Sequence, residues 1–168
     1  AVAADFTPAS YTNFGPEVDI SAPGGDTEYY NAIGEEDNEF WENNEVSGSI
    51  LSTMIRNGSP AYGYMDGTSM ACPHVSGVAA LGLSYAVQQR RHFKASEFVA
   101  LLKESVKPVD NWYSGGKKKT YYRNHNSPAA APSVMELSKY IGKMGTGVVD
   151  AGKLLNNIEG SGSDMKVP

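Results

Sequence analysis

The chain has 168 residues, a length that suits one domain, and its 40% hydrophobic and 20% charged residues are ordinary for a globular protein. Its formal net charge of −5 argues against nucleic acid as a partner, because phosphate backbones bind basic surfaces. No apolar run reaches the ~18 residues that would span a bilayer. The single cysteine, Cys72, excludes an internal disulfide and a multi-cysteine zinc site.

The first third of the chain predicts two short strands and an acidic loop. "AVAAD" (1–5) has the composition of the end of a buried strand, and "EVDISAPGG" (17–25) that of a short strand entering a Pro-Gly turn. Residues 26–49 contain no Lys or Arg and predict a solvated loop. A calcium site is the sharper alternative, although the EF-hand spacing is absent. The acidic residues of this stretch are Asp26, Glu28, Glu35, Glu36, Asp37, Glu39, Glu42 and Glu45.

The middle of the chain predicts a strand, a turn and a long helix. "SILSTMI" (49–55) favours a strand, and "NGSPAYGYMDG" (57–67) supplies turn residues. From Ser69 to about Gln89 the pattern is helical and rich in small residues, which is typical of a helix buried in the middle of a domain. Arg90, Arg91 and His92 follow where a helix C-terminus favours positive charge.

The last third predicts two more helices separated by a loop. Phe98, Leu101 and Leu102 have helical spacing, in a helix that begins at Lys94 or Ser96. Residues 107–133 favour a loop, in which "KKKTYYR" (117–123) indicates a surface hairpin or loop rather than a nucleic-acid patch.

"GTGVVDAGKLLNN" (145–157) ends the ordered part of the chain. It predicts a glycine turn, a short strand, Asp150 as an N-cap and a terminal helix, with residues 158–168 as a disordered tail.

The stretch "DGTSMACPHVSG" (66–77) carries the chemistry. With Ser69 in the first helical turn, its N–H is one of the unpaired donors of a helix start, where the helix dipole would also stabilise an oxyanion. Gly67 lets the backbone approach a bound peptide, and Thr68 can cap or brace the turn. Pro73 has no N–H for the Ser69 carbonyl, so the first turn is distorted at the serine. An ordinary capped helix without chemistry fits the same pattern.

None of the three histidines has the setting of a catalytic base. His74 is five residues after Ser69 and about 140° around the helix, so it is predicted to be structural. His92 lies at a charged helix end and His125 in a loop.

Residues 67–81, "GTSMACPHVSGVAAL", resemble the serine motif of the subtilisin-like serine peptidases. The flanks agree in order: "FTPASYTNFGPEVDISAPG" is similar to the stretch that ends in A-P-G, "ILSTM" to the strand before the serine loop, and "GTGVVDAGKLL" to the closing segment. The resemblance covers most of residues 1–157, with apparent insertions near 25–48 and 112–138. It implies an α/β fold: the C-terminal portion of a three-layer domain with a mostly parallel sheet.

The resemblance also implies roles for individual residues. Ser69 is the expected nucleophile and its N–H one oxyanion donor. Gly67, Thr68 and Pro73 are expected to position it, Met70 to flank it, and Cys72 to be a buried bystander. No metal or cofactor is required for the chemistry, while structural calcium remains compatible with the family. Polypeptide substrates and an extracellular or periplasmic location follow from the resemblance alone.

The departure from the family is large. The Asp motif, the His motif and the oxyanion Asn lie far upstream of the serine in the family, and the 68 residues before Ser69 contain none of them. We therefore expect a serine endopeptidase whose isolated chain is inactive, because a serine without a base is a weak nucleophile. The expected partner is the N-terminal part of the same catalytic domain, or a second copy in a homo-oligomer. The alternative is a non-catalytic module that binds peptides or partners.

Overall fold

The computed structural model describes residues 1–26, 48–121 and 133–160. Several predicted features lie outside the described residues: most of the acidic loop, the larger part of the insertion near 25–48, the middle of the insertion near 112–138, His125, and residues 161–168 of the tail. In the described part, helices and short strands are combined as expected for an α/β chain, and each two-stranded sheet is antiparallel.

A two-stranded sheet and two isolated bridges join four segments of the chain. Val2 pairs in parallel with Pro23, and Ser21 pairs in parallel with Val148. Strand β6 (Val148–Val149) then pairs antiparallel with β3 (Val106–Lys107). The expected mostly parallel sheet is therefore not formed within the described residues: parallel pairing is confined there to isolated bridges. Proline at position 23 limits this pairing because it has no N–H for a ladder.

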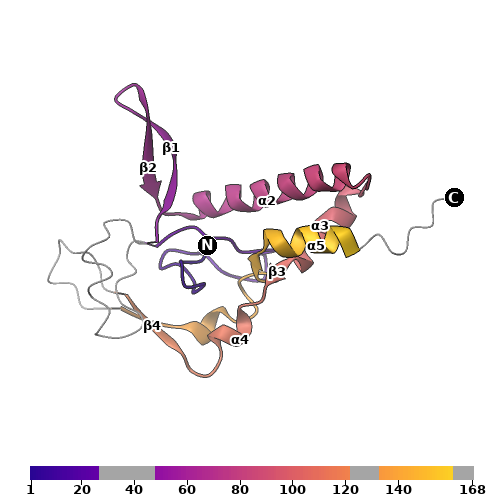
Figure 1. Cartoon of the computed structure of the whole chain (residues 1–168). Helices are drawn as coiled ribbons and strands as arrows, with labels where there is room; N and C mark the ends of the chain where they lie inside the picture. The colour runs from indigo at the N-terminus through magenta and orange to yellow at the C-terminus, as the bar shows by residue number, and fades with distance from the viewer. Residues whose placement is uncertain (27–47, 122–132, 161–168) are drawn as a thin grey trace.

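Strands β1 (Ile50–Arg56) and β2 (Ser59–Met65) form a hairpin that stands away from the rest of the chain (Figure 1). The prediction of a strand at 49–55 is confirmed, but the prediction of turn structure over 57–67 is wrong beyond two residues. The turn is Asn57-Gly58, with φ of 53° and 78°, which are the positive values that a two-residue hairpin turn requires. Because Asn-Gly alone reverses the chain, the residues after it are free to pair with β1.

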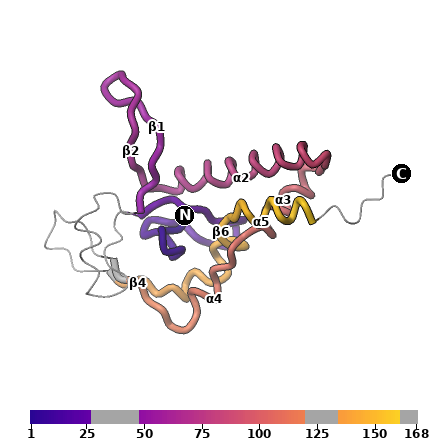
Figure 2. Tube along the Cα trace, in the orientation of Figure 1, coloured from indigo at the N-terminus to yellow at the C-terminus, as the bar shows by residue number. Residues whose placement is uncertain are grey.

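Helix α2 (Thr68–Gln88) matches the predicted long helix within one residue at each end, but it is not buried on all sides. Only Ala71, Gly82 and Ala86 are buried, and α2 lies along one side of the chain above α5 (Ala151–Gly160) (Figures 1 and 2). Gly82 permits this contact: a Cβ there would lie 2.5 Å from Leu154 Cδ2. The apolar side chains that remain exposed on α2 include Leu81, Leu83 and Val87.

Helix α2 is also long and apolar enough to cross a membrane, with a mean hydropathy of 1.3 over its most apolar window. This property of α2 is weak evidence against the expectation that the chain has no membrane span. A core helix of a soluble protein has the same length and composition.

The second predicted helix is α3 (Ala95–Glu104), and Lys94 rather than Ser96 is its N-cap. The Lys94 N–H donates to Glu97 Oε2 at 2.8 Å, which closes the first turn. Phe98 and Leu102 of α3 pack with Ala86, Leu154 and Ile158 in one hydrophobic cluster.

The basic segment after α2 links two helix ends. Arg91 donates through Nη2 to the carbonyl of Glu159 at 2.8 Å and through Nη1 to that of Ile158. These carbonyls belong to the last turn of α5, where no N–H group of the helix is available to donate to them.

The C-terminal prediction is confirmed apart from its end. Asp150 caps α5: its Oδ1 accepts the Lys153 N–H at 2.9 Å. The helix continues to Gly160, and Ile158 is fully buried, so residues 158–160 do not belong to a disordered tail. Amphipathic spacing of Leu154 and Ile158 carries the helix further than the sequence "NNIEG" indicates.

The predicted loop 107–133 contains a short helix and a hairpin. Helix α4 (Asp110–Tyr113) is followed by β4 (Lys118–Tyr121), which pairs antiparallel with β5 (Ser133–Glu136) before the 3₁₀ turn η1 (Leu137–Tyr140). "KKKTYYR" thus begins a hairpin, as predicted. A second hydrophobic cluster lies here, made of Val2, Val109, Tyr113, Leu137, Tyr140, Met144 and Val148.

Two charged residues that the sequence placed at the surface are buried beside each other. Lys119 of β4 is 1% exposed and Asp26 is 1% exposed, with 3.8 Å between Nζ and Oδ2. Lys119 Nζ also donates to Thr7 Oγ1 at 2.6 Å and lies 3.8 Å from Asp5 Oδ1. Asp26 is held further by the N–H and Oγ of Ser10, at 2.7 and 2.8 Å. The buried charges have opposite signs and compensate one another. The acidic stretch that begins at Asp26 and the basic stretch around Lys119 each suggest exposure to solvent when they are considered separately.

Replacing Lys119 with Met is expected to lower the free energy of unfolding by about 3–5 kcal/mol, because two carboxylates would lose their buried counter-charge. The matched control is Lys118→Met. The Lys118 side chain is 61% exposed and lies 3.9 Å from Glu136, so its loss is expected to cost less than about 0.5 kcal/mol. Urea unfolding measures both, and equal effects of the two substitutions would contradict the buried pair.

Tyr113 provides a test at alkaline pH. It is fully buried and donates to the carbonyl of Phe6 at 2.7 Å, and burial, followed by the charges of Asp5 and Asp110, raises its pKa above the usual 10.0. The folded chain keeps this proton where the unfolded chain has lost it. The stabilisation is therefore complete below pH 10.0 and declines as the pH rises above that value.

Tyr113→Phe is expected to lower the free energy of unfolding by about 1–3 kcal/mol at neutral pH, because the Phe6 carbonyl loses its donor. The same variant is expected to flatten the alkaline decline. Urea unfolding across the alkaline range checks both effects; an unchanged slope would show that Tyr113 ionises equally in both states.

Candidate active site

Ser69 lies in the first turn of α2, and its side chain is exposed. Gly67 is the N-cap residue and no side chain caps the helix, so the predicted cap by Thr68 is not formed; Thr68 is the first residue of α2. The first amides of a helix have no acceptor within it, and they carry partial positive charge from the helix dipole. An oxygen that becomes negative beside Ser69 Oγ would meet these donors. The catalytic roles of Ser69, Gly67, Thr68, Met70 and Pro73 remain predictions.

Pro73 lies inside α2, as the sequence requires. It brings no N–H to the carbonyl of Ser69, four residues earlier, so that carbonyl lacks its ordinary helical donor. The helix is nonetheless continuous from Thr68 to Gln88. The opening turn is closed instead by Gly67, whose carbonyl accepts the N–H groups of Met70 and Ala71 at 3.0 and 3.3 Å.

The residue before this turn is fixed by a distant segment. The Gly67 N–H donates to the carbonyl of Gly24 at 2.9 Å. Gly24 is buried, and a Cβ on it would lie 2.7 Å from the Gly67 carbonyl oxygen and 2.6 Å from Ala1 Cβ. Only glycine therefore fits at position 24. The sequence signal for this contact was the Pro-Gly-Gly run after "DISA", which we interpreted only as a turn.

Gly25 and Asp66, the residues next to Gly24 and Gly67, also lie close together. Gly25 has φ of +78° and a Cβ there would lie 2.3 Å from Asp66 Oδ1. Position 25 therefore requires glycine both for its backbone conformation and for space. Two consecutive glycines, 24 and 25, thus lie directly against Asp66 and Gly67.

The described histidines do not reach Ser69 by a hydrogen bond. His74 Nδ1 donates to the carbonyl of Met70 at 2.8 Å, so its ring is engaged with the helix backbone, as a structural role requires. His92 is exposed after the end of α2. His125 lies outside the described residues.

Two neighbours of Ser69 differ in their surroundings. Met70 is half-buried, and its Sδ would lie 3.5 Å from a Cβ on Gly67, so its sulfur sits against the N-cap. Cys72 is exposed, and the expectation of a buried cysteine is wrong. It projects from a side of α2 that no described element covers.

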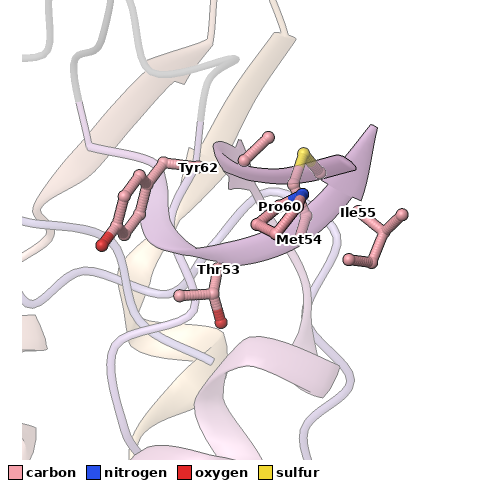
Figure 3. A pocket seen from close by; sticks show the side chains of 6 residues that line it. Thr53, Met54, Ile55, Pro60 and Tyr62 are labelled. Carbon is pink, nitrogen blue, oxygen red and sulfur yellow. The ribbon is translucent and has the colours of Figure 1, made fainter. Parts of the chain in front are cut away.

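A hollow of about 380 Å³ lies on the β1–β2 hairpin, lined by Thr53, Met54, Ile55, Pro60, Ala61 and Tyr62 (Figure 3). Tyr62 and Ile55 lie at its opposite ends (Figure 3). These residues flank the Asn57-Gly58 turn, whereas Ser69 follows the other end of β2. The hollow therefore belongs to the tip of the hairpin and not to the serine.

In the part of the chain that the structure describes, His, Cys, Asp and Glu side chains form no group of three that could hold a metal ion. Structural calcium therefore stays a prediction, since most of the acidic residues between 26 and 49 lie outside the described part.

Comparison with known proteins identifies relatives of this site. A profile described as the subtilase family, Peptidase_S8, matches residues 2–137, which include Ser69 and both glycines. An "Extracellular protease" of Xanthomonas campestris pv. campestris is 35% identical over 112 residues, covering 64% of this chain and 15% of that protein. A "Thermophilic serine proteinase" of Bacillus sp. (strain AK1) is 30% identical over 113 residues, covering 67% of this chain and 21% of that protein. The chain thus matches about a fifth or less of the length of these relatives.

Replacing Gly24 with Ala tests the contact that fixes Gly67. The added methyl has no room beside the Gly67 carbonyl, so the first turn of α2 must shift. We expect Ser69 in the full-length protein to react with a fluorophosphonate about tenfold more slowly or worse, since small displacements of a reacting group are costly. The rate of covalent labelling, followed by mass spectrometry, is the measurement.

Gly15→Ala is the control for that substitution. Gly15 is half-buried outside α2, its φ is not positive, and a Cβ there meets nothing within 4 Å. The variant is expected to leave the labelling rate unchanged, because the added methyl displaces no neighbour. Equal labelling of the Gly24→Ala and Gly15→Ala variants would contradict the contact.

Proposed function

Because the chain belongs to the subtilase family, we propose that it supplies the nucleophile of a serine endopeptidase and that Ser69 is this nucleophile. Ser69 Oγ would attack the carbonyl carbon of a peptide bond, giving a tetrahedral oxyanion and then an acyl-enzyme, with loss of the amine. Water would then release the acyl group from Ser69. The observation that carries the proposal is the exposed serine in the first turn of α2.

The helix start supports stabilisation of the oxyanion. The Ser69 N–H is among the amides without an intrahelical acceptor, and it points out of the same end of α2 as the dipole. A preorganised donor of this kind acts on charge that exists only in the transition state. Gly67, Thr68 and Pro73 would position the serine, and Met70 would flank it.

We propose that the general base and its carboxylate partner lie outside these 168 residues. His74, the histidine nearest to Ser69 in sequence, directs Nδ1 to the Met70 carbonyl, and His92 is exposed beyond the end of α2. The relatives named above extend far beyond the matched segment. The isolated chain would then be inactive, since a serine hydroxyl without a base is a weak nucleophile.

The uncovered face of α2 also supports the proposal that part of the catalytic domain lies outside these 168 residues. Leu81, Leu83 and Val87 are 49%, 46% and 67% exposed, although α2 has the composition of a buried helix. We propose that the N-terminal part of the same catalytic domain covers this face. It would also add strands to the isolated parallel bridges Val2–Pro23 and Ser21–Val148, completing a mostly parallel sheet in a three-layer domain. A homo-oligomer is the alternative cover.

Polypeptide substrates and secretion follow from the same family membership. One relative is named an extracellular protease, and we propose an extracellular or periplasmic location for this protein also. Structural calcium would be compatible with that location and is not needed for acyl transfer.

Fluorophosphonate labelling tests the proposal. The full-length protein is expected to be labelled stoichiometrically at Ser69, and its Ser69→Ala variant not at all. The isolated chain of 168 residues is expected to react about 10²–10⁴-fold more slowly, because it lacks the general base.

Two outcomes would contradict these statements. Rapid stoichiometric labelling of the isolated chain would show that a base lies within it. A full-length protein that is folded but neither labelled nor able to cleave casein would favour the non-catalytic module.

A further inference from the structure

Residues 24–26, which include the partner of Gly67, are held by hydrogen bonds from Ser10 and Tyr11. The Tyr11 hydroxyl lies 2.8 Å from the carbonyl oxygen of Gly24 and 2.5 Å from that of Gly25, and it donates to this pair. Ser10 donates to Asp26 through both N–H and Oγ. We call Gly24 and Gly25 the glycine strap. Residues 10 and 11 thus bind the strap and the residue that follows it.

The Gly24 carbonyl joins this clasp to the nucleophile turn. It accepts the Tyr11 hydroxyl on one side and the Gly67 N–H, at 2.9 Å, on the other. A carbonyl oxygen has two lone pairs, so both donors are accommodated at once. Tyr11 and Gly67 are therefore joined through this one oxygen, two residues before Ser69.

The location of the strap fits this connection. The N-terminal segment that carries Tyr11 and the strap lies at the foot of the β1–β2 hairpin, where α2 begins (Figure 1). A Cβ on Gly24 would lie 3.0 Å from the Tyr11 hydroxyl and 2.7 Å from the Gly67 carbonyl oxygen. Side chain, strap and turn are therefore in contact without a gap in which the strap could shift.

The surroundings of the hydroxyl keep it a donor. Tyr11 is 39% exposed as a residue, but burial raises the pKa of its hydroxyl to about 12. The charges of Asp66 and Asp26 add to this increase, and the Gly67 amide opposes it. The phenol therefore retains its proton throughout the neutral range. A phenylalanine would fill the same space without the donor.

We propose that Tyr11 is a positioning residue for Ser69: its hydroxyl orients the Gly24 carbonyl, which holds Gly67 and thereby the first turn of α2. The kinetic part rests on the proposed peptidase function, whereas the structural part does not. Tyr11 makes no hydrogen bond to Ser69 or to another described residue of α2, so its link to the helix runs through the strap and Gly67.

The test uses the full-length protein with Tyr11→Phe and, as a matched control, Tyr62→Phe. Tyr62 is 74% exposed near the tip of the hairpin, and its hydroxyl makes no hydrogen bond to the described residues. Amide hydrogen exchange of peptides covering residues 66–70 reports on Gly67, and steady-state hydrolysis of a peptide substrate gives kcat and KM. Thermal unfolding is measured on each protein.

Tyr11→Phe is expected to speed exchange at Gly67 about tenfold and to lower kcat about three- to tenfold at unchanged KM, the loss that one misplaced hydrogen bond produces. Tyr62→Phe is expected to match the wild type in every measurement. Ser10→Ala adds a second comparison: it removes a bond to Asp26 but not to the strap, so it is expected to lower the melting temperature and leave exchange at Gly67 unchanged.

Each other outcome is decisive. Wild-type exchange at Gly67 in Tyr11→Phe would overturn the positioning role. So would a lower melting temperature with kcat retained, because that describes structural support alone. If the wild type hydrolyses no peptide, the proposed function fails, while exchange at Gly67 still decides whether Tyr11 holds the turn.

Discussion

The hydrogen bond from the Gly67 N–H to the Gly24 carbonyl is the constraint on which the candidate site depends. It joins the end of the β1–β2 hairpin and the start of α2 to a segment more than forty residues earlier. Without it, the serine turn would be attached only by its two flanking elements, one of which is an exposed hairpin. No side chain caps α2, so this main-chain contact fixes the N-cap residue and leaves the Ser69 amide of the first turn available.

A buried charged residue, Asp26, fixes the chain directly after Gly24 and Gly25. Asp26 follows the two glycines directly, and it lies buried against Lys119 from the β4–β5 hairpin and Ser10 from the N-terminal segment. A buried carboxylate is costly unless it is paired, so this arrangement favours one position of the chain over nearby alternatives. Segments from both predicted insertion regions therefore meet directly after the two glycines that contact Asp66 and Gly67.

Helix α2 shows the opposite situation, in which apolar surface exceeds what the chain covers. Gly82 and Ala86 pack against α5 and α3, and Arg91 joins the end of α2 to the carbonyls of α5. The opposite face leaves Leu81, Leu83 and Val87 exposed. A stable domain seldom leaves such a helix half covered, which agrees with a chain that matches only part of the length of its relatives.

The sequence by itself determined the local elements: the β1 strand, the start and end of α2 and the Asp150 cap follow from short-range patterns of apolar, glycine and capping residues. It also determined the family, because "GTSMACPHVSG" and the segments around it resemble those of the subtilases. Only the tertiary structure decided that Lys119 and Asp26 are buried together, that "SPAYGYM" forms a strand, that α2 is covered on one face, and that Tyr11 and Gly24 hold the turn. These depend on contacts between residues distant in sequence, and no local pattern specifies which partner a buried charge or a glycine will meet.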